Sequence, residues 1–100
     1  MKYKVVYIAL AKEDLKKAIT YYKNISPKLA KDFIARIAEG KKHILLNPKG
    51  DDVMYKEIRT HNISQFPYHI HYQILEDKMQ LLILAVEFSK RDNLDFSDRK

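Results

Sequence analysis

Two imidazole side chains, His69 and His71, stand two positions apart in an alternating segment of the chain. Successive side chains of a β-strand point to opposite faces, so both rings would lie on one face, with Tyr68 and Ile70 on the other. Imidazole titrates near neutral pH and can act as a general acid or base. This spacing therefore predicts a strand with a polar face that is able to do chemistry.

Cationic side chains occur in the strands expected on either side of this segment. Lys56 and Arg59 precede it, and Lys90 and Arg91 follow a continuous apolar run at residues 81–86. Guanidinium and ammonium groups bind phosphate oxygens. If the strands pair, Arg91 at the end of the apolar run would meet the two histidines on one polar face of the sheet.

The same residues also fit a surface without chemistry. Two histidines on an exposed strand can contact a partner or only water. Arg59 and Arg91 can pair with neighbouring acidic side chains, and such surface ion pairs contribute at most about 1 kcal/mol each. The sequence leaves open whether this face reacts, binds or is only solvated.

A metal site is a further possibility for this strand, because His69 and His71 share one face. Zinc would need two more ligands, or one and a water molecule, and His61 and Glu87 are the obvious candidates. We predict no metal and no cofactor.

Hydrophobic periodicity places these residues in the element order β-α-α-β-β-β. An apolar i, i+3, i+4, i+7 stripe is typical of a helix, and Ser26 before Pro27 is a favoured helix start. The expected elements are a strand at residues 3–10, helices at 12–23 and 27–46, and strands at 53–60, 68–75 and 79–86. We expect an α+β fold in which an antiparallel helical hairpin packs on one face of an antiparallel sheet.

Length and composition indicate one domain over residues 1–100. Of these residues, 46% are hydrophobic, which is enough for one small core. We predict a loosely ordered tail at residues 89–100, where only Leu94 and Phe96 are apolar anchors.

The absence of cysteine excludes disulfides and thiolate chemistry. No signal peptide or bilayer-spanning run is recognisable, so we expect a cytoplasmic protein.

The net charge of +6 is concentrated in the first half of the chain. Residues 1–50 hold twelve Lys and Arg against four Asp and Glu, a balance of +8, whereas residues 51–100 have a balance of −2. A basic surface attracts nucleic acid or an acidic protein partner. The positive charge therefore falls on the predicted helices rather than around the histidines.

Several short motifs, taken in their order and spacing, resemble those of the RelE/ParE superfamily of bacterial toxins, which are often labelled plasmid stabilisation proteins. The resemblance covers most of the chain. Its motifs are Glu13-Asp14-Leu15, Tyr21-Tyr22, Ser26-Pro27, Phe33, Asn47-Pro48, Arg59, Phe66-Pro67-Tyr68 with Tyr72, and Lys90-Arg91-Asp92.

This resemblance implies the toxin of a type II toxin–antitoxin system, held inactive by a small antitoxin whose C-terminal part wraps it. ParE-like members inhibit DNA gyrase, whereas RelE-like members cut messenger RNA on the ribosome. Cleavage of RNA without a metal needs a cation beside a proton donor. For a ribonuclease, the resemblance therefore implies Arg59, His69 and Arg91 as candidate catalytic residues that meet on one face of the sheet. Their neighbours Lys56, His71 and Lys90 are candidates for binding RNA or another target.

The C-terminal segment departs from the RelE-like pattern. Such enzymes often carry a Tyr or His there that works on the 2′-hydroxyl, and residues 93–96 contain neither. We therefore favour a ParE-like toxin that binds its target without chemistry, with a ribosome-dependent mRNA endonuclease as the alternative. In both cases we expect an acidic antitoxin that covers Leu94 and Phe96.

Overall fold

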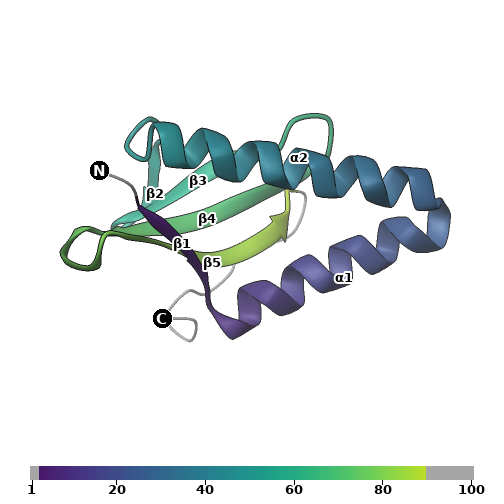
Figure 1. Ribbon diagram of the computed structural model, residues 1–100, viewed down its shortest axis with the longest axis horizontal. Coiled ribbons are helices and arrows are strands. Elements are labelled where there is room, and N and C mark those ends of the chain that lie inside the picture. The colour runs from purple at the N-terminus through teal and green to yellow at the C-terminus, as the bar shows by residue number, and fades with distance from the viewer. Residues whose placement is uncertain (1–2, 90–100) are drawn as a thin grey trace.

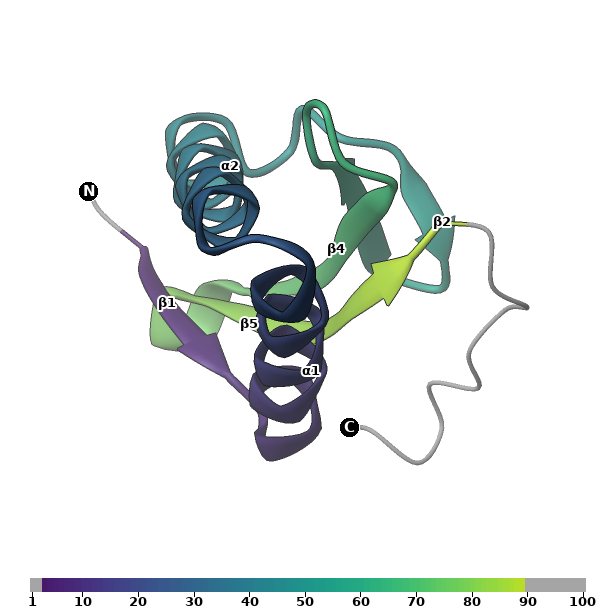
Figure 2. The ribbon, with the colours of Figure 1, turned by 90° about the vertical axis from the view of Figure 1, so that its right-hand side faces the viewer.

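The computed structural model describes residues 3–89, in which a first strand leads into a helical hairpin and then a series of antiparallel strands (Figure 1). The strands are β1 (Lys4–Tyr7), β2 (Val53–Tyr55), β3 (Ile58–Asn62), β4 (Tyr68–Leu75) and β5 (Gln80–Phe88). The helices are α1 (Ala9–Ile25) and α2 (Pro27–Leu46), and a 3₁₀ turn at Glu76–Lys78 joins β4 to β5. Figure 2 looks nearly along the two helices, with the twisted sheet beside them.

The five strands within residues 3–89 form one sheet, in the order β1-β5-β4-β3-β2. Neighbours from β2 to β5 pair antiparallel, whereas β1 pairs with β5 in parallel, with Val5 opposite Leu81. A parallel pair needs a long crossover, and the helical hairpin supplies it. The predicted α+β fold and element order are confirmed, and the parallel pair makes the sheet mixed rather than antiparallel throughout.

Helix α1 extends beyond the predicted residues 12–23 at both ends. At its N-terminal end it includes Ala9 and Leu10, which are strong helix formers, in place of the predicted end of the first strand. Asp14 therefore lies beyond the first turn of the helix. Its carboxylate instead accepts a hydrogen bond of 3.2 Å from the backbone N–H of Val86 in β5. This bond connects α1 to β5, which lies next to the central strand β4.

Helix α2 begins and ends where the sequence predicts, at Pro27 and Leu46. The backbone N–H of Leu29 donates to the Ser26 hydroxyl at 3.4 Å, which is the N-cap interaction expected from this residue pair. In Figure 1 α1 and α2 meet at one end of the hairpin and diverge toward β1.

The strand predicted at residues 53–60 is two strands, β2 and β3, joined by a tight turn. Tyr55 pairs with Ile58, and Lys56 between them has a left-handed backbone with φ of 51°. Two-residue hairpin turns need a positive φ, which usually calls for Gly or Asn. Because neither residue is present, the sequence did not signal this turn, and Lys56 lies in the turn rather than on the sheet face.

The core lies between the helices and the sheet and centres on an aromatic cluster. Tyr22 of α1 and Phe33 of α2 pack against Phe66 and Tyr68, with ring centroids 5.0–6.1 Å apart. Ile70 and Tyr72 continue the same face of β4 and are fully buried. The alternate residues of β4, including the two histidines, therefore lie on the face away from the helices.

Four residues named from the sequence, Lys90, Arg91, Leu94 and Phe96, lie outside the described part of the chain, as does the predicted tail apart from Ser89. Between residues 3 and 89, neither helix is long and apolar enough to cross a membrane.

Candidate functional site

The polar face of β4 carries a cluster of three side chains, His69, His71 and Glu87. Glu87 belongs to β5 and is paired in register with His69. Its Oε1 atom lies 3.0 Å from Nε2 of His71 and 3.3 Å from Nε2 of His69. The two imidazoles thus converge on one carboxylate oxygen, as the alternation of β4 predicts for their shared face.

This cluster is almost closed to solvent. The exposed fraction is 1% for the His71 side chain, 6% for Glu87 and 17% for His69. Nδ1 of His71 lies 2.9 Å from the hydroxyl of Thr60 on β3, which holds the ring with its Nε2 atom toward Glu87. His69 is therefore the accessible edge of an otherwise buried polar site.

The predicted meeting of Arg59 with the histidines is wrong. Arg59 is paired with Tyr72, whose side chain faces the helices, whereas Asn62 is the residue opposite His69. The guanidinium donates hydrogen bonds to the carbonyls of Asp51, at 2.6 Å, and Lys49, at 3.2 Å. Arg59 therefore holds the loop between α2 and β2 and is directed away from the imidazoles.

Lys56, which the sequence predicts as a binding residue, is also separate from the two histidines. Lys56 is exposed in the β2–β3 turn, with its ammonium 5.5 Å from the Tyr55 ring centroid. The structure thus brings together His69 and His71 and adds Glu87, which the sequence offered only as one of two possible metal ligands. The other, His61, lies on the helix-facing side opposite Ile70.

A second polar cluster, which the sequence did not reveal, surrounds Asp51. Its carboxylate lies 3.0 and 3.1 Å from Nδ1 of His61 and accepts a hydrogen bond of 3.0 Å from the Tyr72 hydroxyl. The same hydroxyl lies 2.8 Å from the carbonyl of Pro48. Together with Arg59, these contacts fasten the α2–β2 loop to the sheet, so we assign the cluster a structural role.

Burial raises the pKa of the Tyr72 phenol well above its ordinary value of 10.0, and the hydrogen bond and charge of Asp51 raise it further. We expect Tyr72→Phe to lower the free energy of unfolding by about 1–3 kcal/mol at pH 7, because it removes a hydrogen bond to a carboxylate. Above pH 10 the unfolded phenol ionises while the native one stays protonated, so the stability that the hydroxyl contributes is lost as pH rises. Urea unfolding of the unmodified chain and Tyr72→Phe from pH 7 to 11 should show that the difference between their free energies of unfolding becomes smaller. A difference that stays constant over this range would contradict the prediction.

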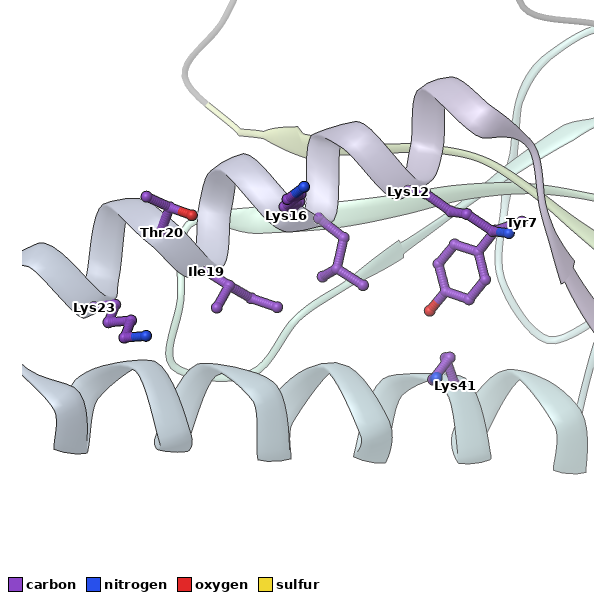
Figure 3. A pocket seen from close by; sticks show the side chains of 8 residues that line it. Tyr7, Lys12, Lys16, Ile19, Thr20, Lys23 and Lys41 are labelled. Carbon is purple, nitrogen blue, oxygen red and sulfur yellow. The ribbon is translucent and has the colours of Figure 1, made fainter.

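An open groove lies between α1 and α2 and follows most of the length of α1 (Figure 3). Leu15 and Ile19 of α1 and Tyr7 of β1 form its apolar part. Four lysines, together with Thr20, complete the lining: Lys12, Lys16, Lys23 and Lys41. The Lys41 ammonium lies 5.3 Å from the Tyr7 ring centroid, within cation–π range. The sequence placed the basic excess on the helices but did not indicate this groove, because it is formed by separate elements.

Comparison with known proteins identifies the family. A profile described as the ParE toxin of the type II toxin–antitoxin system, parDE, matches residues 5–93. The fold is similar to a solved structure of the chromosomal ParDE toxin–antitoxin system from P. aeruginosa, with TM-score 0.75 and 17% identity over 88% of this chain and 97% of that one. Sequence comparison with curated proteins gives no significant match.

Structures of RelE-type systems share the fold with lower TM-scores. The RelBE toxin–antitoxin complex of E. coli gives a TM-score of 0.59 at 11% identity, over 89% of this chain and 99% of that one. The RelBE2 complex of Mycobacterium tuberculosis gives a TM-score of 0.55 at 20% identity, over 88% of this chain and 99% of that one. At these identities the likeness concerns the fold and not the site.

Proposed function

The chain belongs to the ParE toxin family of type II toxin–antitoxin systems, and we propose that it arrests growth by binding DNA gyrase and is neutralised by a cognate antitoxin. The match to the ParE family over residues 5–93 is the observation that carries this proposal.

The separation of the polar groups supports a toxin that binds rather than one that cuts RNA. Cleavage of a phosphodiester needs a cation and a proton donor at the same phosphate. Here the Arg59 guanidinium is bonded to two carbonyls on the helix-facing side, across the sheet from His69. His69 and His71 both face the Glu87 carboxylate, whose charge repels a phosphate.

Pulse-labelling after controlled induction of the chain in bacteria tests the proposed target. We expect DNA synthesis to stop while protein synthesis continues, and purified chain to inhibit supercoiling by purified gyrase. His69→Gln should leave the growth arrest intact, because no chemistry depends on this imidazole. An immediate stop in protein synthesis, with transcripts cut in ribosome-bound codons and toxicity lost in His69→Gln, would instead establish the RelE-like ribonuclease.

The antitoxin is proposed to place an acidic, amphipathic segment in the groove between the helices. The groove offers an apolar floor of Leu15 and Ile19, and its rim of four lysines would attract carboxylates. Its volume of about 410 Å³ suits several side chains of a docked segment rather than a folded domain. Such a segment would cover apolar surface that water otherwise contacts.

A further inference from the structure

We propose that His69, His71 and Glu87 form a binding site for a divalent transition-metal ion, with zinc as the preferred occupant. The potential ligand atoms of the three side chains all lie within 4.8 Å of one another. Two imidazoles and one carboxylate are a ligand set that proteins use for zinc, with a fourth position left to water. This site is independent of the proposed action on gyrase.

Two of the three distances within the cluster, those from Glu87 to each imidazole, are close to the ligand spacing of a coordination sphere. Zinc lies about 2.0–2.2 Å from imidazole nitrogen and carboxylate oxygen, so tetrahedral ligands stand roughly 3.3 Å apart. The Oε1 atom of Glu87 is 3.0 Å from Nε2 of His71 and 3.3 Å from Nε2 of His69. An ion could therefore bind between Glu87 and the two imidazoles, with side-chain adjustment that brings ligand atoms now within 4.8 Å of one another to this spacing.

Only one of the two carboxylate oxygens of Glu87 has a hydrogen-bond partner among residues 3–89. Its second oxygen, Oε2, is buried and has no hydrogen-bond partner among residues 3–89. A buried carboxylate oxygen without a partner is costly, and a carboxylate charge in a closed site needs compensation. A divalent cation held by Glu87 supplies that compensation, which the described side chains provide only through Oε1.

The surroundings of His71 match those of a metal ligand. Ligating histidines usually engage their second ring nitrogen with a neighbouring polar group, which fixes the ring and its tautomer. Nδ1 of His71 lies 2.9 Å from the Thr60 hydroxyl, while Nε2 faces the cluster. His69, with 17% of its side chain exposed, gives an ion a route from solvent. Nitrogen ligands favour zinc over magnesium or calcium, which prefer oxygen.

Zinc titration of the metal-free, untagged full-length chain tests this site by calorimetry. We expect one ion per chain with a dissociation constant below about 10 µM, and no comparable uptake of magnesium. His69→Gln and Glu87→Gln should each weaken zinc binding at least about tenfold, since each removes a ligand. Cobalt should give the visible absorption of a tetrahedral complex in the unmodified chain, a readout that requires no variant.

His61→Gln is the matched control, because His61 is paired with Asp51 on the opposite face of the sheet. It should leave zinc binding unchanged. The proposal is overturned if the unmodified chain takes up no stoichiometric zinc, if His69→Gln and Glu87→Gln bind as well as it does, or if His61→Gln weakens binding equally. The three side chains would then be a proton-sharing structural cluster.

Discussion

Replacing Phe33 with alanine is expected to lower the free energy of unfolding by about 3–5 kcal/mol. Phe33 is fully buried, and its ring lies 5.0–5.2 Å from those of Tyr22, Phe66 and Tyr68. The substitution removes apolar contacts that join α2 to α1 and to the start of β4. It leaves a cavity that these elements cannot fill by moving together. Urea unfolding of the purified chain measures the loss.

The adjacent residue Ile34 is the matched control for this measurement. It stands on the same helix but its exposed fraction is 47%, so it contributes little to the core. Ile34→Ala should change the free energy of unfolding by less than about 1 kcal/mol. Similar losses from Phe33→Ala and Ile34→Ala would contradict this prediction, because alanine favours the helix at both positions and only burial in the aromatic cluster distinguishes them.

Reversing the charge of two groove lysines is expected to cause the largest loss of affinity for the antitoxin. The double variant Lys12→Glu/Lys16→Glu places carboxylates on the rim where we propose that an acidic segment docks. Juxtaposed like charges in an interface cost several kcal/mol, so affinity should fall about 100-fold or more. Calorimetry with the antitoxin encoded beside the toxin would measure this, and coexpressed antitoxin should no longer rescue growth.

Lys31 and Lys78 provide a control with the same change of net charge. Both are exposed and neither lines the groove. Lys31→Glu/Lys78→Glu should therefore reduce affinity by less than about tenfold, through long-range electrostatics alone. If both double variants lose affinity to the same extent, the antitoxin responds to total charge and the groove is not its binding site.

The sequence was sufficient where structure depends on neighbouring residues. Ser26 and Pro27 define the start of α2 through one local capping bond, and the predicted bounds of this helix are confirmed. The alternation of β4 likewise predicted that His69 and His71 share the face opposite Tyr68 and Ile70. Both inferences use spacings of a few residues, at which side-chain direction follows from backbone geometry.

The prediction for Arg59 failed because its face depends on the register between β3 and β4, which the spacing along one strand does not give. In that register Arg59 is opposite Tyr72, and Asn62 is opposite His69. A shift of one residue moves a side chain to the other face of a sheet. Matching Arg59 by motif therefore placed it in the right strand but on the wrong side.

The α+β class, the second helix, the shared face of the two histidines and the resemblance to this toxin family all follow from the amino-acid sequence. The meeting of Glu87 with the histidines does not, because it depends on the pairing of β4 with β5. The register between β4 and β5 shifts next to Leu84, so Ile83 is opposite Tyr72 on the helix side while Ala85 and Glu87 turn to the histidine side. A bulge adds one residue and reverses the alternation that follows. Because such a shift is set by pairing between strands, spacing along one strand cannot reveal it.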